Sequence, residues 1–223
     1  MLMSTSKQAI RQRIAKRVAQ EFNDGDVVNL GIGLPTLVAN EISPEIEILF
    51  QAENGLLGIG EMADETNKDW DLVNAGAQYI TAVEGAGYFN SADSFAIIRG
   101  GHVDATVLGA LEVDEQGNLA NWIVPGKMVP GMGGAMDLVV GAKKVIIAME
   151  HTAKGNPKLL KQCTLPLTAT GQVDMVVTEL GVFEITSQGM VMTEIAEGVR
   201  FDEVQSQTDT PLIPSPSMKI MNG

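Results

Sequence analysis

The sequence predicts an α/β fold in which a mainly parallel sheet is covered by helices on both faces. Apolar runs rich in β-branched residues occur at 26–30, 47–52, 95–113, 143–149 and 173–179, and they resemble strands buried on both sides. Segments with helical spacing or glycine-rich turns separate these runs, an alternation typical of parallel sheets. No internal repeat or linker divides the chain, so we expect a single domain over residues 1–223.

The amino-terminal elements are predicted from local signals. Apolar side chains at helical spacing predict a first helix over about 6–22, which ends at the turn residues 23–25. The strand at 26–30 enters a glycine loop, and Pro35 suits the first turn of a helix over 35–42. The strand at 47–52 then leads into an Asn-Gly turn.

The rest of the chain is read in the same way. We expect a polar surface loop over 58–74, at least one fully buried strand within 95–113, and a turn at 114–118. The glycine-rich residues 130–138 lead into a short helix, and strands follow at 143–149 and 173–179. Beyond about residue 205 the periodicity is lost and three prolines occur, which predicts an irregular surface tail.

Composition excludes several classes of protein. The 28 acidic and 15 basic residues give a formal charge of −13, which argues against nucleic acid as the main partner. A single cysteine, Cys163, excludes a disulfide framework and a Cys-rich metal site, and the two histidines have no metal-ligand spacing, so no metal is expected. No apolar run approaches the ~20 residues of a membrane span. The basic amino terminus lacks the apolar core of a secretory signal, so a cytoplasmic location is expected.

Two glycine loops are candidate ligand sites. Residues 29–36, NLGIGLPT, follow a strand and open a helix, where backbone N–H groups can hold a phosphate or carboxylate. The third glycine of a dinucleotide fingerprint is replaced by Thr36, and a simple tight turn explains the loop equally well. In residues 130–137, PGMGGAMD, consecutive glycines allow close backbone approach to a ligand, although a turn with Met132 and Met136 as core side chains is the alternative.

Glu53 is the strongest candidate for a catalytic residue. It follows an apolar strand directly and precedes Asn54-Gly55, which places a carboxylate at the carboxyl end of a predicted parallel strand. Open α/β sheets bind their ligands at that edge. Most glutamates in such a position are simply solvated residues beside a turn. If Glu53 is functional, it would act as a general base or as a nucleophile.

The remaining reactive side chains give weaker signals. His102 and Asp104 lie two residues apart on a predicted strand, and a satisfied buried histidine is favoured over a catalytic pair. His151 follows Glu150 just past a strand end, which gives only slight support for a catalytic role. Cys163 has no neighbour that would activate it and is expected to be structural.

Together, five motifs closely resemble the B half of the 3-oxoacid CoA-transferases, a family that includes the succinyl-CoA:3-ketoacid and the acetate (or butyrate)–acetoacetate enzymes. The resemblance covers about residues 7 to 200. The motifs are VNLGIGLPT (28–36), AENGLLG (52–58), FAIIRGGHVDATVLGA (95–110), NLANWIVPGKMVPGMGGAMDLV (118–139) and KVIIAMEH (144–151). Each motif is modest alone, but their order and spacing make a chance similarity improbable.

The resemblance implies that Glu53 is the covalent nucleophile, which forms an acyl-glutamyl anhydride and then a glutamyl-CoA thioester. It also implies that Asn29, Gly31 and Gly33 line the CoA side of the pocket and that Gly133 and Gly134 lie beside the thioester. Coenzyme A would be a substrate, with no further cofactor, and the acceptor would be a short 3-oxo acid such as acetoacetate. The donor would be succinyl-, acetyl- or butyryl-CoA. An A subunit is the expected partner, in an α2β2 heterotetramer.

Two other functions use the same superfold. A sugar-phosphate isomerase or sensor would need a carboxylate as proton shuttle and a basic residue for the phosphate. A non-catalytic regulatory subunit would be marked by loss of the glutamate, which this sequence retains. The AENG motif and the later GMGG run favour the transferase over both.

Overall fold

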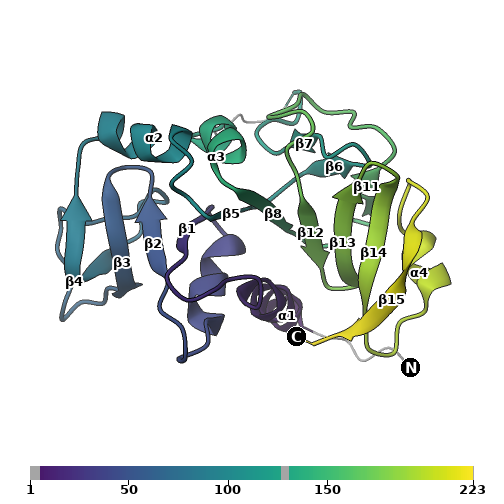
Figure 1. Cartoon of the computed structure of the whole chain (residues 1–223), viewed down its shortest axis with the longest axis horizontal. Coiled ribbons are helices and arrows are strands. Elements are labelled where there is room, and N and C mark those ends of the chain that lie inside the picture. Colours follow the sequence, from purple (N-terminus) through teal and green to yellow (C-terminus); the bar gives the residue numbers. More distant parts are fainter. Residues whose placement is uncertain (1–5, 127–130, 223) are drawn as a thin grey trace.

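A computed structural model describes residues 6–126 and 131–222. Its centre is a ten-stranded sheet with the order β15-β14-β13-β12-β8-β5-β1-β2-β3-β4 (Figure 1). The strands of this sheet are β1 (Val27–Leu30), β2 (Leu49–Ala52), β3 (Leu56–Met62), β4 (Ile80–Tyr88), β5 (Ala105–Leu108), β8 (Lys144–Ala148), β12 (Met175–Thr178), β13 (Gly181–Thr186), β14 (Gly189–Ala196) and β15 (Ile213–Met221).

The sheet is parallel at its centre and mixed toward its edges. Strands β2, β1, β5, β8 and β12 run parallel to one another, so their carboxyl ends share one edge. Antiparallel hairpins extend the sheet on either side, through β3 and β4 at one end and β13 and β14 at the other. The predicted fold class, α/β with a mainly parallel central sheet, is therefore confirmed.

Helices cover both faces of the sheet. The helices α2 (Ser91–Arg99) and α3 (Ala135–Gly141) lie on one face, and α1 (Lys7–Ala19) lies on the other (Figure 1). The 3-10 helix η1 (Pro35–Glu41) packs against α1 and β1. The remaining elements are α4 (Phe201–Gln205), β6 (Glu112–Asp114), β7 (Leu119–Ala120), β9 (Thr152–Ala153), β10 (Asn156–Pro157) and β11 (Leu159–Leu160).

Strand β8 shows how the apolar runs build two cores. Val145 and Ile147 belong to the hydrophobic cluster that includes α2, α3 and α4 residues, whereas Ile146 and Ala148 belong to the cluster beneath α1 and η1. Side chains alternate between the faces of a strand, so a strand covered on both sides must be apolar at every position. All four β8 residues from Val145 to Ala148 are buried.

Helix α1 is fixed to the sheet by buried ion pairs. The Arg17 guanidinium donates to both carboxylate oxygens of Glu194 on β14, at 2.7 and 2.9 Å, and to Glu21 at 2.6 Å. Glu21 also accepts a 2.6 Å hydrogen bond from Lys144 at the start of β8. Burial acts to raise the pKa of Glu21, but the bonds from Lys144 and Arg17 outweigh burial and hold that pKa below its usual value.

The structure corrects two local expectations and confirms a third. The predicted loop 58–74 contains the second half of β3, to Met62. The fully buried strand expected within 95–113 is confirmed as β5, although the run begins with the end of helix α2. The expected irregular tail beyond about 205 is wrong, because β15 pairs in parallel with β14. β15 is an edge strand with an irregular register, where Pro214 and Pro216 are tolerated because one side of the backbone needs no partner.

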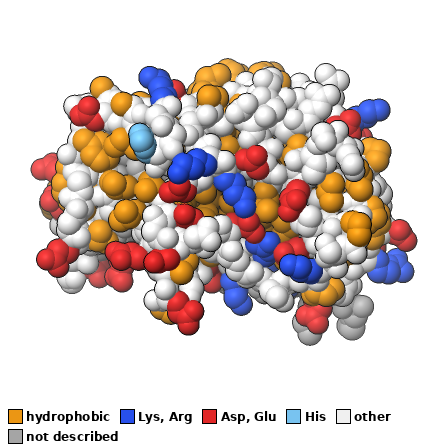
Figure 2. Space-filling view, in the orientation of Figure 1, with side chains coloured by type: hydrophobic (Ala, Val, Ile, Leu, Met, Phe, Trp, Pro, Cys, Tyr) orange, Lys and Arg blue, Asp and Glu red, His pale blue; other side chains and the backbone are white. Residues whose placement is uncertain are grey.

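Surface charge is mixed on the viewed face. Figure 2 shows acidic and basic side chains interspersed, with several Lys and Arg side chains near the middle of the molecule. No helix among the described residues is long and apolar enough to cross a membrane.

Candidate active site

Glu53 lies at the carboxyl end of β2, as the sequence predicts. Its backbone is set by a turn in which the Gly55 N–H donates to the Ala52 carbonyl at 3.0 Å and the Asn54 side chain donates to the Val73 carbonyl at 2.8 Å. Gly55 has φ +124°, and a side chain there would collide with the Phe89 carbonyl oxygen. Asn54 and Gly55 therefore shape the turn that positions Glu53, and only glycine fits at residue 55.

The second glycine loop approaches this carboxylate. The Gly134 N–H donates to Glu53 Oε1 at 3.1 Å, a contact between residues 81 apart in sequence. A Cβ atom at Gly133 would lie 3.3 Å from Glu53 Oε1, and one at Gly134 would lie 2.8 Å from Glu53 Oε2. The structure thus brings Gly133 and Gly134 together with Glu53, and any side chain at Gly134 would displace the carboxylate. Pro130, where the predicted glycine-rich run starts, lies outside the described residues.

Asn29 lies beneath the site in a polar network. Its side chain is only 3% exposed and donates from Nδ2 to the Gln51 carbonyl at 3.0 Å and to Gln51 Oε1 at 2.7 Å. Gln51 in turn donates to Ser94 Oγ on α2 at 2.9 Å. Gln51 is two residues before Glu53, so this network ties the end of β2 to β1 and α2.

Sequence reasoning missed Gln51 and Ser94. The available signal was a polar residue, Gln51, within an otherwise apolar strand and two residues before the candidate nucleophile. A buried amide needs hydrogen-bond partners. The sequence alone does not show that Ser94, 43 positions away, is one of them.

Gly31 and Gly33 have conformational reasons for being glycine. A Cβ at Gly31 would lie 3.0 Å from Leu108 Cδ2, and the Gly31 N–H donates to the Val107 carbonyl at 2.8 Å. Gly33 has φ +90° and lies beneath the guanidinium of Arg11, whose Nη2 is 3.8 Å from where a Cβ would stand. The loop thus packs tightly against β5, and its predicted contact with CoA stays a prediction.

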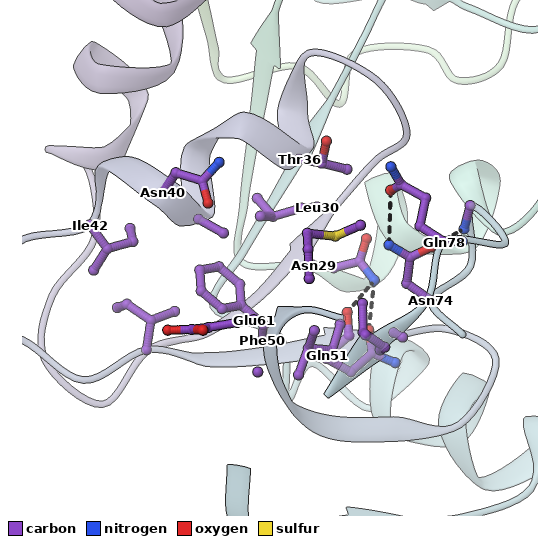
Figure 3. Close-up of a pocket in the computed structure, with 18 of the residues that line it drawn as sticks. Asn29, Leu30, Thr36, Asn40, Ile42, Phe50, Gln51, Glu61, Asn74 and Gln78 are labelled. Carbon is purple, nitrogen blue, oxygen red and sulfur yellow. Dashed lines mark hydrogen bonds between the residues drawn. The ribbon is translucent and has the colours of Figure 1, made fainter. Parts of the chain in front are cut away.

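Two cavities flank this glycine loop. The first, the apolar cavity, has a volume of about 510 Å³ and lies between η1, the strands β1 to β3 and residues 74–80. Figure 3 shows Leu30, Ile42 and Phe50 in its wall, with the Asn29–Gln51 and Asn74–Gln78 hydrogen bonds beside them. The second, the basic cavity, has a volume of about 450 Å³ and is lined by Lys7, Arg11, Lys154 and Lys158 among others. Ile32 lines both cavities and is 71% exposed.

The histidines are not part of this site. His151 is fully buried, with Nδ1 3.0 Å from Thr178 Oγ1 and Nε2 3.0 Å from Thr208 Oγ1. Because the Thr208 hydroxyl donates to the Val204 carbonyl, it accepts from Nε2–H, which leaves Nδ1 to accept from Thr178. Burial, with a smaller effect of the Lys158 charge, lowers the pKa of His151 to about 4. His151 is thus a neutral structural residue.

His102 differs from expectation because its side chain is exposed. Asp104 does not pair with it: its carboxylate accepts from the Val27 N–H at 2.8 Å and from Lys143 at 2.6 Å. The loop that follows α2 carries His102 to the surface before β5 begins. The favoured prediction of a buried histidine is therefore wrong.

Cys163 has the environment of an inert thiol. Burial, aided by the negative charges of Asp114 and Glu112, raises its pKa to about 12. Its backbone N–H donates to Asp114 Oδ2 at 3.0 Å, which fits the structural role predicted for it. Among residues 6–126 and 131–222, no group of three or more His, Cys, Asp or Glu side chains could hold a metal ion.

The comparisons with known proteins point to one family. The profile of the coenzyme A transferase family matches residues 11–207. The chain is 60% identical over 200 residues to the beta chain of the acetate CoA-transferase of Escherichia coli K12, covering 89% of this chain and 91% of that one. It is 56% identical over 201 residues to the B chain of the succinyl-CoA:3-ketoacid coenzyme A transferase of Helicobacter pylori 26695. That alignment covers 90% of this chain and 97% of the relative.

A solved structure supports the fold independently. The acyl-CoA transferase of E. coli O157:H7 superposes with a TM-score of 0.76 at 24% identity, covering 95% of this chain and 43% of that longer chain. The chain described here belongs to the coenzyme A transferase family. Within it, the chain is similar to the subunits named B or beta, and CoA transfer is the activity that this membership establishes.

Proposed function

We propose that this chain moves CoA between a short acyl-CoA and a 3-oxo acid such as acetoacetate, with Glu53 as the covalent nucleophile. The observation that carries the proposal is the Glu53 carboxylate itself: it stands at the carboxyl end of β2 and accepts the Gly134 N–H at 3.1 Å. The names of the relatives support acetate or succinate as one of the two acids and a 3-oxo acid as the other. The reaction uses CoA as a substrate and needs no further cofactor.

The first half-reaction follows from the groups present. A Glu53 carboxylate oxygen attacks the thioester carbonyl, the new C–O bond forms, and the C–S bond breaks to release CoA thiolate and leave an acyl-glutamyl anhydride. The thiolate then attacks the glutamyl carbonyl, which frees the first acid and leaves a glutamyl-CoA thioester. The second acid repeats these steps in reverse. Anhydride and thioester are both activated acyl groups, so no step needs an external energy source.

Gly134 has a defined part in this sequence. Each attack places negative charge on a carbonyl oxygen, and a fixed backbone N–H beside the reacting carbon stabilises that charge. The Gly134 N–H already points at the carboxylate, and the absence of side chains at Gly133 and Gly134 leaves space for the thioester. Asn29, Gly31 and Gly33 contribute a rigid wall on the side of β1, where the pantetheine arm would pass.

We further propose that an A subunit completes the active site, in an α2β2 heterotetramer. The relatives at 56–60% identity are named as the beta or B subunit of a CoA-transferase, which supports a second kind of subunit. The half-buried state of Glu53 also supports the proposal, because a reactive anhydride must be shielded from water. A cytoplasmic location stays a prediction.

The test uses the chain purified with its A partner. The complex is incubated with acetoacetyl-CoA and no acceptor acid, treated with borohydride, and mapped by peptide mass spectrometry. We expect reduction or a CoA adduct on the peptide that contains Glu53, and none in Glu53→Ala, whose turnover falls by roughly 10⁴-fold or more. Glu84→Gln, an exposed glutamate on β4, is the matched control and keeps full activity. An adduct on another residue, or full activity in Glu53→Ala, would refute the mechanism.

A further inference from the structure

Helix α2 connects the two loops that meet at Glu53. In Figure 1, α2 and α3 lie side by side over the same face of the sheet. The chain enters α2 beside the turn that carries Glu53, because the Phe89 N–H donates to the Gly55 carbonyl at 3.0 Å. Within the helix, Ser94 is fully buried, and its hydroxyl accepts from Gln51 Nε2 at 2.9 Å. The start of α2 is therefore attached to the end of β2 at two points.

The other end of α2 holds the start of α3. Arg99, the last residue of α2, donates from Nε to Asp137 Oδ1 at 2.6 Å. Asp137 lies in the first turn of α3, three residues after Gly134, whose N–H is the donor at the active site. The backbones of the two helices are also in close contact, because a Cβ atom at Gly141 would collide with the Ile98 carbonyl oxygen. The position of α3 is therefore set by α2.

The bond between Gln51 and Ser94 lies where apolar side chains are expected. Gln51 is 1% exposed and Ser94 is 0% exposed, on elements that pack against each other inside the protein. Both ends of the Gln51 amide are bonded, because its Oε1 also accepts from Asn29 Nδ2 at 2.7 Å. Hydrogen bonds are directional, so a satisfied buried network fixes one arrangement where apolar packing tolerates several. The network thus fixes the backbone two residues before Glu53.

We propose that Ser94 and Arg99 are positioning residues for CoA transfer, and that α2 sets the separation between Glu53 and Gly134. The inference rests on Glu53 being the nucleophile. Ser94 and Arg99 are five residues apart, which rotates their side chains by about 140° around the helix axis and separates them by about 7.5 Å along it. One side chain can therefore reach the sheet while the other reaches α3. Each acts through its partner and not on the reacting atoms.

The reaction needs this separation to stay constant. When CoA thiolate attacks the glutamyl carbonyl, negative charge develops on an oxygen of Glu53, and the Gly134 N–H beside that oxygen stabilises it. The two groups are already 3.1 Å apart. A misplacement of about 1 Å costs on the order of 10² in rate. Because both groups act in the bond-making steps, loss of positioning should lower kcat and leave KM unchanged.

The first arm of the experiment separates position from stability, in the complex with the A subunit. Ser94→Ala leaves the buried Gln51 amide without its acceptor. The double variant Ser94→Ala/Gln51→Met removes both polar groups and keeps a similar volume, while Asn29 retains its bond to the backbone carbonyl of residue 51. Ser91→Ala, at an exposed serine on the same helix, is the matched control. We measure kcat, KM for acyl-CoA and melting temperature for each variant.

For Ser94→Ala, we expect kcat to fall about tenfold with KM unchanged, and the melting temperature to fall by a few degrees. The double variant should regain the wild-type melting temperature and keep the low kcat, because apolar side chains fill the space without fixing the end of β2. Ser91→Ala should match the wild type. A double variant with wild-type kcat would overturn the inference, since the effect of Ser94→Ala would then be one of stability alone.

The second arm tests Arg99 through its partner. Arg99→Met, Asp137→Ala and the double variant are compared with Lys143→Met. The Lys143–Asp104 ion pair is an apt control: it is also 2.6 Å long, and its side chains are 63% and 28% exposed, against 66% and 28% for Arg99 and Asp137.

Arg99→Met and Asp137→Ala should each lower kcat about fivefold, and the double variant should lose no more than either single one, since all three remove the same contact. Melting temperatures should barely change, because exposed ion pairs contribute little to stability. Lys143→Met should keep the wild-type kcat. Additive losses in the double variant, or equal kcat values for Arg99→Met and Lys143→Met, would overturn the role of Arg99.

A single-turnover measurement separates failure of this inference from failure of the Glu53 mechanism. Acyl-CoA is mixed with the complex without acceptor acid, and the Glu53 adduct is followed over time. In Ser94→Ala it should form about tenfold more slowly and reach the wild-type yield. Formation at the wild-type rate would overturn the inference and leave Glu53 as the nucleophile. Absence of the adduct from the wild type would refute the Glu53 mechanism and the inference with it.

Discussion

Replacing Gly134 by alanine tests the geometry of the active site most directly. Gly134 has φ −81° and ψ 6°, a conformation open to any residue, so the backbone does not resist the change. The new Cβ would stand 2.8 Å from Glu53 Oε2, 2.9 Å from Cδ and 3.2 Å from Oε1. These distances are shorter than van der Waals contact, so the Glu53 carboxylate must move. The substitution therefore acts on the proposed nucleophile and leaves the fold intact.

The size of the effect follows from two losses. The carboxylate must retreat by roughly 0.5–1 Å, and a misplacement of about 1 Å costs on the order of 10² in rate. The retreat also breaks the 3.1 Å bond from the Gly134 N–H to Glu53 Oε1. Loss of one oxyanion donor costs roughly 10²–10³ in kcat. The two losses overlap, so we expect kcat to fall by about 10²–10³ with a small change in KM.

Steady-state kinetics of the complex with its A subunit measure this effect. Gly87→Ala is the matched control, because its Cβ would meet only Phe89 Cε1, at 4.0 Å. Thermal melting of both variants should stay near the wild-type value, since a glycine-to-alanine change at a permitted conformation is neutral to slightly stabilising. An unchanged kcat in Gly134→Ala would show that Gly134 does not adjoin the reacting carboxylate. A large drop in the melting temperature of Gly134→Ala would show that the substitution lowers activity by destabilising the fold.

Two further predictions concern stability. Arg17→Met should lower the free energy of unfolding by about 3 kcal/mol in urea titrations, because it leaves Glu194 without its partner and Glu21 with Lys144 alone. Arg13→Met, exposed on the same helix, should change it by less than about 0.5 kcal/mol. The pKa of His151 falls from 6.5 to about 4 on folding, so the unfolded chain binds more protons as the pH falls below 6.5. Its contribution, about 3 kcal/mol, is present above pH 6.5 and is lost as the pH falls to 4, so wild type should lose that much more stability over this range than His151→Gln. If the free energy of unfolding changed equally with pH in the two proteins, His151 would not be held neutral in the folded state.

Much of the central sheet is predictable because each strand carries its own signal. Strands β1, β2, β8 and β12 are apolar at most positions, since both faces are covered, and turn residues bound them. Within the run at 95–113 the buried strand β5 is predictable, but the end of α2 that precedes it is not, because a short apolar run does not distinguish the end of a helix from a strand. The strand β15 in the residues beyond about 205 is missed for a different reason. The prolines there exclude a central strand, but an edge strand tolerates them.

The candidate site is predictable only in part. Glu53 and its Asn-Gly turn are local in sequence and can be placed at the end of a strand by pattern alone. The contact with Gly134 joins two distant loops, and it depends on how α3 packs over the sheet. The basic cavity is harder to predict still, because Arg11 lies on the first helix and Lys158 lies between β10 and β11, with no sequence pattern that connects them.

The partial burial of Glu53 indicates what each subunit would contribute to the active site. On one side its carboxylate is covered by Gly133 and Gly134, which offer a hydrogen bond and no side chain. The residue is nevertheless half-exposed in this chain, and an anhydride formed there would meet water. Hydrolysis of that anhydride would discard the energy of the thioester, so efficient transfer needs the open side to be closed. We infer that this chain supplies the nucleophile and one donor, whereas exclusion of water depends on a surface from the partner subunit. The chain alone should therefore hydrolyse acyl-CoA slowly at Glu53, and addition of the A subunit should convert that hydrolysis into transfer.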